Sequence, residues 1–185
     1  VMGYNAKNEY ADVVIGRNSS AKDYWSTVVG ADSSSVGQYS TLVGNRNIEY
    51  KALSGAASQT NANSILGHNN SVMGSYNAIL GQQNIVNSNG SVTATGATGV
   101  EHNVVVGYAN GVRGNQNIVL GMNGTFPTVG DRNIVIGQSS GTAGSVAPSD
   151  TIGIGSRALT YNNNAIALGT SVTSTGQTTN YSTSI

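Results

Sequence analysis

The sequence predicts an all-β protein built as a parallel β-roll solenoid, in which each coil comprises two seven-residue halves and the coils stack along one axis. Three observations carry this prediction. Glycine recurs at seven-residue steps, aliphatic runs precede every second glycine, and asparagine follows the same step. A short repeat at a fixed period is typical of solenoid proteins, in which each unit contacts its neighbours.

Glycine spacing defines the unit. Gly67, Gly74 and Gly81 follow one another at the seven-residue step, and the same step recurs elsewhere in the chain. Glycine and β-branched residues form helices poorly, which argues against a coiled coil despite the seven-residue period. A left-handed β-helix has a six-residue repeat, and calcium-binding rolls have a nine-residue repeat rich in Gly and Asp, so both are disfavoured. The aliphatic runs read as strands at 13–15, 27–29, 41–43, 64–66, 78–80, 104–106, 118–120, 134–136 and 166–168.

Asparagines mark the expected turns. They follow the seven-residue step at Asn63, Asn70, Asn77 and Asn84, and again at 103, 110 and 117. We expect these residues to take up the left-handed backbone conformation of a tight turn, which asparagine tolerates. Because neighbouring coils lie about 4.8 Å apart, we also expect their amides to hydrogen-bond along the rod as a ladder.

Several strands are aliphatic on both faces. A strand with one solvated face alternates apolar and polar residues, yet residues 104–106, 118–120 and 134–136 do not alternate. One face is therefore expected to fill the roll and the other to meet a partner surface, most simply an identical rod. The second strand of each coil, such as 111–113, is more polar and is expected to face outward. The predicted core and protomer-contact residues are Val14, Ile15, Val28, Val29, Leu42, Val43, Ile65, Leu66, Ile79, Leu80, Val105, Val106, Val119, Leu120, Val135, Ile136 and Leu168.

The runs at 63–67, 70–74 and 164–169 resemble the head repeat of trimeric autotransporter adhesins, the YadA-like heads. That repeat is a 14-residue unit built on Asn-Ser-Val-Ala-Ile-Gly, and the resemblance extends over most of the chain. It implies a left-handed parallel β-roll in a homotrimer on the outer membrane of a Gram-negative bacterium. It also implies a non-enzymatic adhesin whose partner is a host immunoglobulin-like cell adhesion molecule or a matrix protein such as collagen, fibronectin or laminin. The middle strand position is often Val or Ile rather than Ala, which departs from the motif associated with collagen binding.

The chain reads as a single head fragment over 1–185. Regular coils are expected at about 1–44, 63–84, 103–137 and 151–176, with irregular insertions at about 45–62, 85–102, 122–132 and 138–150. The start at Val1-Met2-Gly3, a pattern also found inside the chain, indicates a piece of a longer protein. No neck, stalk heptads or membrane barrel is recognised, so contact with a membrane is expected through an anchor outside this sequence.

Composition argues against several other functions. Charged residues make up 9% of the chain and the net charge is zero, so a nucleic-acid partner is not expected. The chain contains no cysteine, which excludes disulfides and cysteine-ligated metals. We expect no cofactor, metal or catalytic residues, since neither His68 nor His102 accompanies a nucleophile. Both histidines are interpreted as solvated turn residues. A further hypothesis is that the three copies of Arg113 or of Arg132, if they point at a three-fold axis, form an anion-binding ring.

Aromatic residues supply the candidate receptor-binding positions, which are Phe126, Pro127, Trp25, Tyr39, Tyr10 and Tyr24. Phe126 and its neighbour Pro127 form either a protruding apolar anchor or a cap over the roll. The other four make two pairs at the spacing of the full repeat, so each pair is expected to stack on successive coils. An exposed aromatic ladder binds proteins or glycans in one interpretation and merely stabilises the sheet in the other.

Two alternative functions remain open at this point. A phage tail fibre or spike also uses trimeric β-rods. An acyltransferase of the left-handed helix class is disfavoured by the seven-residue period and by the setting of both histidines.

Overall fold

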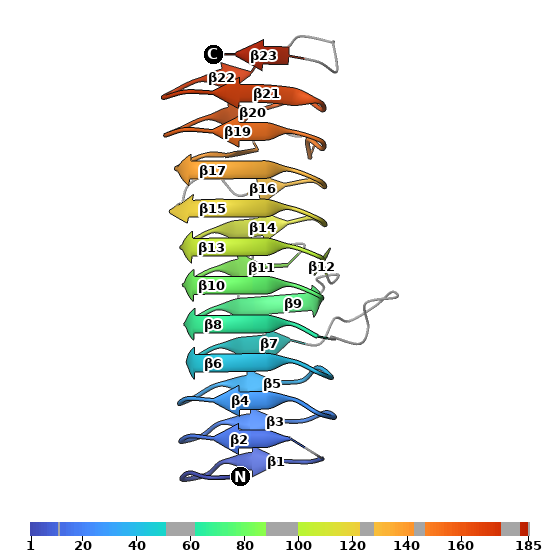
Figure 1. Ribbon diagram of the computed structural model, residues 1–185, viewed down its shortest axis with the longest axis vertical. Helices are drawn as coiled ribbons and strands as arrows, with labels where there is room; N and C mark the ends of the chain where they lie inside the picture. Colours follow the sequence, from blue (N-terminus) through green and yellow to red (C-terminus); the bar gives the residue numbers. More distant parts are fainter. Residues whose placement is uncertain are drawn as a thin grey trace.

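The computed structural model describes residues 1–10, 12–50, 62–87, 100–122, 128–142, 147–174 and 182–184. Within these ranges every regular element is a β-strand, and all strand pairs are parallel. The strands stack in chain order into a rod with the N-terminus at one end and the C-terminus at the other (Figure 1). The all-β, parallel, repetitive architecture predicted from the glycine period is therefore confirmed.

Two sheets make up the long sides of the rod. The larger sheet contains β2 (Val13–Ile15), β4 (Thr27–Val29), β6 (Thr41–Asn45), β8 (Ser64–His68), β10 (Ala78–Gln82), β13 (Val104–Tyr108), β15 (Ile118–Met122), β17 (Ile134–Gln138), β19 (Ile152–Ile154), β21 (Ala165–Leu168) and β23 (Ser182–Ser184). The opposite side contains β1 (Lys7–Asn8), β3 (Ser20–Ala21), β5 (Ser34–Ser35), β7 (Ile48–Tyr50), β9 (Ser71–Ser75), β11 (Ile85–Val86), β12 (Val100–Glu101), β14 (Gly111–Arg113) and β16 (Thr128–Val129). A third sheet pairs β18 (Gly141–Thr142), β20 (Leu159–Thr160) and β22 (Thr173–Ser174).

The strand register is continuous although the coils differ in length. Most coils advance by two seven-residue steps, as from Val28 to Leu42, but Leu42 pairs with Ile65 and Ile79 pairs with Val105. Additional residues thus leave the stacking of the strands intact. The described parts of the four stretches expected to be irregular contain in-register strands, namely β7, β11, β16 and β18.

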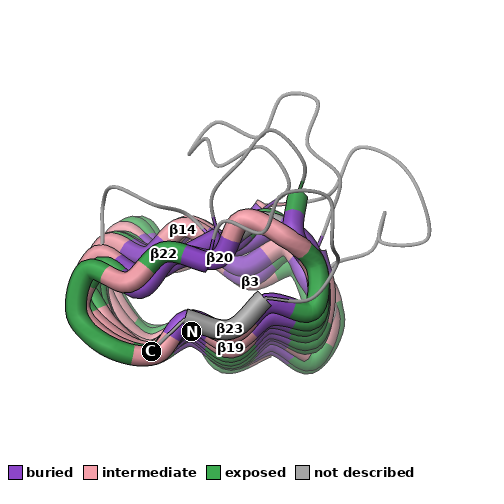
Figure 2. Tube along the Cα trace, turned by 90° about the horizontal axis from the view of Figure 1, so that it is seen from above, coloured by how far each residue is buried: buried purple, intermediate pink, exposed green. Residues whose placement is uncertain are grey.

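The core is a single line of aliphatic side chains between the sheets. In the larger-sheet strands from β2 to β17 the second residue points inward and is buried, as at Val14, Leu42 and Val105. The opposite sheet contributes buried residues such as Val86 and Val112. Figure 2, seen along the rod, shows buried stretches of the chain on both sides of the roll. The expectation that the polar second strand faces outward is therefore wrong for its central residue, because a narrow roll must fill its interior from both sides.

The predicted core residues divide between the two faces of the larger sheet. Val14, Val28, Leu42, Ile65, Ile79, Val105, Val119 and Val135 point into the roll. The residue that follows each of them lies on the outer face of the sheet: Ile15, Val29, Val43, Leu66, Leu80, Val106, Leu120 and Ile136. Leu168 belongs to the same column, because it is the strand partner of Ile154. The outer residues are exposed or half-buried in the single chain, which makes them available to a partner surface.

Glycine is required where the coils come closest. Gly67 has a φ of +142°, and a Cβ added there would lie 1.8 Å from the carbonyl oxygen of Gly81 on the next coil. Side chains are excluded by that contact and disfavoured by that backbone angle. The glycine period is thus a consequence of backbone stacking at the corner.

Asparagine ladders follow both corners of the roll, as predicted. Asn77 donates from Nδ2 to Oδ1 of Asn63 at 3.1 Å, and Asn103 donates to Asn77 at 3.0 Å. Each amide also donates to a backbone carbonyl, as Asn77 does to Val100 at 2.9 Å. At the other corner, Asn84 donates to Asn70 at 3.0 Å. These buried amides are satisfied from both sides, which stabilises the stack.

The predicted backbone conformation of these asparagines is wrong by one residue. Positive φ values occur at the residue before each one, for example Tyr76 (58°) before Asn77 and Gln83 (56°) before Asn84. The left-handed residue turns the chain and leaves its own side chain outside. The asparagine that follows can then point inward and join the ladder.

A buried carboxylate lies where the inward-facing corner residues change from serine in the first coils to asparagine in the later ones. Glu49 is 1% exposed and accepts four hydrogen bonds. Its Oε1 accepts from Ser40 Oγ at 2.7 Å and Asn63 Nδ2 at 2.6 Å. Its Oε2 accepts from Ser35 Oγ at 2.6 Å and from the Gly37 amide at 3.0 Å. Glu49 therefore connects the serines of the first coils to the asparagines above them.

Candidate functional site

One corner of the roll carries a column of outward-facing side chains. The column lies just before the strands of the larger sheet, and each of its residues has a positive φ and precedes an inward-facing residue. Its members are Trp25, Tyr39, Ala62, Tyr76, His102, Gln116, Arg132, Asp150 and Asn164. Because the coils are in register, these side chains lie one above another at the strand spacing, about 4.8 Å. We call this column the ladder corner.

Four exposed aromatic rings form a continuous cluster at the N-terminal end of the ladder corner. Trp25 and Tyr39 stack with ring centroids 5.2 Å apart and planes inclined by 21°. Tyr10 and Tyr24 lie 4.1 Å apart, and Tyr24 lies 5.7 Å from Trp25, which joins the two pairs. All four side chains are between 41% and 57% exposed. The regular repeat spacing thus identified a real aromatic surface, and the neighbouring Tyr24 raises the pKa of Tyr10.

A second stack on the same column was missed from the sequence. Tyr76 and His102 lie 5.0 Å apart with planes inclined by 15°. The chain step from one to the other is longer than the regular repeat, so a search at the regular spacing does not find them. The signal that could have found them is the asparagine after each residue, since Asn77 and Asn103 occupy the same position of the coil. His102 is a solvated turn residue, as expected, with a φ of 59° and a side chain that is 55% exposed, and it also stacks on Tyr76.

The C-terminal part of the ladder corner is charged. Arg132 donates from Nε to Oδ1 of Asp150 at 2.6 Å, and its second nitrogen donates to Oδ2 at 2.9 Å. This bidentate pair lowers the pKa of Asp150 and raises that of Arg132. Because the guanidinium already binds a carboxylate, Arg132 is poorly suited to the anion-binding ring considered above. Arg113 lies exposed on β14, on the opposite sheet.

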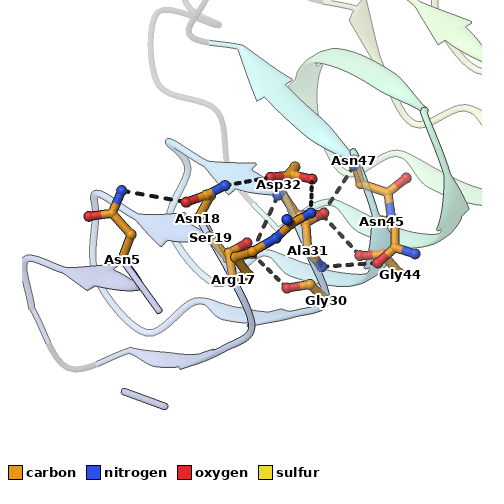
Figure 3. A network of polar contacts seen from close by, with 11 residues as sticks. Asn5, Arg17, Asn18, Ser19, Gly30, Ala31, Asp32, Gly44, Asn45 and Asn47 are labelled. Carbon is orange, nitrogen blue, oxygen red and sulfur yellow. Dashed lines mark hydrogen bonds and ion pairs between the residues drawn. The ribbon is translucent and has the colours of Figure 1, made fainter. Parts of the chain in front are cut away.

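The other corner of the roll is polar, in contrast to the aromatic cluster on the ladder corner. Asn18 donates to Asp32 at 2.9 Å, and Arg17 donates to the same carboxylate at 3.3 Å (Figure 3). The Asn18 hydrogen bond and the Arg17 charge lower the pKa of Asp32. The amide of Ala31 donates to Asn45 Oδ1 on the next coil at 3.0 Å. The two corners therefore present different chemistry to a partner.

The outer face of the larger sheet forms an apolar stripe. One column of the stripe is aliphatic over ten successive coils, at positions 15, 29, 43, 66, 80, 106, 120, 136, 154 and 168. Leu66 and Leu80 are 49% and 47% exposed and border a shallow groove with Val104. A stripe of this length is larger than the apolar patches that monomeric proteins usually expose.

The remaining candidates lie elsewhere. Phe126 and Pro127 fall outside the residues that the structure describes. His68 ends β8 at the polar corner and is half-buried. In the described ranges, no group of three or more His, Asp or Glu side chains is placed to hold a metal ion. Nor does this part of the chain contain a helix long and apolar enough to cross a membrane.

We also compared the chain with known proteins. The search against protein-family models and the search against curated proteins found no match.

Proposed function

We propose that the protein is a non-enzymatic adhesin head, in which three left-handed β-rolls associate along their apolar stripes and bind a host surface protein. The head belongs to a fibre on the outer membrane of a Gram-negative bacterium. This proposal builds on the resemblance of the repeats at 63–67, 70–74 and 164–169 to YadA-like heads. Avidity from three copies would raise the apparent affinity of a weak single site.

The apolar stripe supports self-association. It extends over ten coils at the spacing of the coils themselves, and an identical rod offers a complementary surface at the same spacing. Its members include Ile15, Leu66, Leu80 and Ile154, whose side chains are 38–49% exposed in the single chain. Burying them would remove this apolar surface from water, which favours association.

The single observation that carries the binding function is the aromatic cluster of Tyr10, Tyr24, Trp25 and Tyr39. Large aromatic side chains at a rigid surface supply contact area at low entropic cost, and they are enriched in binding hot spots. The cluster lies on the ladder corner rather than on the apolar stripe. Self-association and receptor binding would therefore use different faces of the rod.

Binding assays with substituted cluster residues test this proposal. We expect the double variant Trp25→Ser/Tyr39→Ser to lose at least ~10-fold in binding to cultured host cells and to surfaces coated with collagen, fibronectin or laminin. The matched control is Tyr108→Ser, which removes a 43% exposed tyrosine at the polar corner. Wild-type binding by the double variant, or an equal loss in the control, would overturn the assignment.

A further inference from the structure

Among the residues that the structure describes, the ladder corner contains a step with only a small side chain between two aromatic rings. Tyr39, Ala62 and Tyr76 occupy the same position on three successive coils, because Thr41 pairs with Ser64 and Ser64 pairs with Ala78. Ala62 has a φ of 53°, within a few degrees of its two neighbours, so its backbone follows the column. Its side chain is a methyl group, whereas the rings on either side are 57% and 54% exposed.

The size of this step matches one planar group. Two coil steps separate Tyr39 from Tyr76, or about 9–10 Å at the strand spacing. Elsewhere on the column, successive rings lie 5.2 Å apart at Trp25–Tyr39 and 5.0 Å apart at Tyr76–His102. A planar group inserted above Ala62 would thus lie at the same distance from both tyrosine rings as the rings of the ladder lie from each other.

Charge around the step favours a cation. Gln38, next to Tyr39, donates to the carboxylate of Asp23 at 3.3 Å. On the other side, Glu101 is the strand partner of Ser75, the neighbour of Tyr76, and its side chain is 36% exposed and lies 3.9 Å from the His102 ring. Tyrosine faces attract cations, and the planar guanidinium stacks on aromatic rings better than the compact ammonium of lysine does.

We propose that the step between Tyr39 and Tyr76 is a binding site for an arginine side chain of a partner protein. The guanidinium lies over Ala62 between the two rings, and the carboxylates of Asp23 and Glu101 lie one coil beyond Tyr39 and Tyr76, respectively. This inference deepens the proposed function and rests on it in assigning the arginine to a host receptor. The binding chemistry of the step itself does not depend on that function.

Titration with small amides tests the site directly. The protein carries ¹³C-labelled tyrosine rings, and the signals of Tyr39 and Tyr76 are assigned with Tyr→Phe variants. We expect L-argininamide to shift both signals saturably, with a Kd at least ~5-fold lower than that of L-lysinamide. Absence of a shift, equal affinity for the two amides, or tighter binding of L-tryptophanamide would overturn the proposal.

Filling the step supplies the matched variant. We expect Ala62→Tyr to abolish the response to L-argininamide, because it completes the ladder at a backbone angle that Tyr39 and Tyr76 already adopt. Ala109→Tyr, which changes the corresponding alanine at the polar corner (φ 55°), should bind as wild type does. Ala62→Gln is a second filled variant, since Gln116 occupies the same column. Unchanged binding by both filled variants would overturn the site.

Cell attachment by Ala62→Tyr separates this inference from the proposed function. Loss of attachment together with loss of L-argininamide binding supports the assignment of the arginine to a host receptor. If attachment is unchanged while L-argininamide binding is lost, that assignment is overturned and the adhesin proposal stands. The adhesin proposal itself is tested independently by the Trp25/Tyr39 assay described above.

Discussion

Asn63 donates a hydrogen bond of 2.6 Å to the buried carboxylate of Glu49, which lies 14 residues earlier in the chain, on strand β7 of the opposite sheet. The same carboxylate oxygen accepts from Ser40, so one charged group satisfies the donors of two successive coils. A buried carboxylate is costly unless hydrogen bonds compensate for lost hydration. Glu49 receives that compensation from Ser35, Gly37, Ser40 and Asn63 together.

Replacing Glu49 by Gln should destabilise the roll by roughly 2–4 kcal/mol. Whichever way the new amide is oriented, its NH₂ group faces a donor that cannot reverse, either the Gly37 amide or the Asn63 side chain. Urea denaturation followed by circular dichroism measures the loss. The control Glu9→Gln changes an exposed residue and should stay within ~0.5 kcal/mol of wild type. Equal stability of Glu49→Gln and wild type would contradict the four-bond description.

The variant Asn77→Ala should lower the free energy of unfolding of the roll by about 2–3 kcal/mol. It removes the donor to the carbonyl of Val100 and the acceptor of the Asn103 side chain, leaving buried groups unsatisfied. Asn77→Ser should recover part of the loss, because serines such as Ser26 donate to a glycine carbonyl at the same position of the coil. Thermal melts of both variants test this order. An Ala variant at least as stable as the Ser variant would show that the ladder contributes little.

The Arg132–Asp150 pair makes a predicted contribution to acid stability. Because the pKa of Asp150 is lower in the folded protein than its ordinary value of 3.8, the contribution is complete above that value and is lost as the pH falls through the folded-state pKa. Asp150→Asn should therefore lower Tm at pH 6 and have less effect at pH 2.5. Melting curves at the two pH values provide the comparison. A Tm difference that is the same at both would exclude a charge-dependent contribution.

Charges on the apolar stripe should dissociate the assembly without unfolding the roll. Leu66→Glu/Leu80→Glu places two carboxylates on the outer face, where association would bury them without partners. We expect at least a ~100-fold weaker association, about 2.7 kcal/mol. Arg113→Glu, on the exposed face of β14, is the control and should associate as wild type does. Sedimentation velocity reports the association, and circular dichroism checks the fold. Equal loss of association in the control would place the contact elsewhere.

The repeat made most of the fold predictable from the sequence. Gly67 and Gly81 mark corners where backbone stacking excludes a side chain, and the aliphatic triplets mark strands, so coil length and strand position follow directly. The left-handed residues were harder to predict, because Tyr76 and Gln83 adopt that conformation through stacking rather than by intrinsic preference. The prediction that asparagine is the turn residue therefore placed the left-handed backbone conformation one residue too late in the chain.

The candidate site was predictable where the coils keep the regular repeat spacing. Trp25 and Tyr39 were found in this way, but the Tyr76–His102 stack was hidden by the longer step between their coils. Glu49 could not be identified as a core residue, because a charged side chain is normally exposed and its four donors come from three different coils. Its burial follows from the path of the chain around the roll and not from the local sequence.

Sedimentation equilibrium on the wild-type chain tests the central claim most directly. The chain has a mass of 18.8 kDa, so association of three rods along the apolar stripe predicts a single species of three times that mass at micromolar concentration. The Leu66→Glu/Leu80→Glu variant should sediment under the same conditions as an 18.8 kDa species. A wild-type protein that remains a monomer at micromolar concentration would contradict the account.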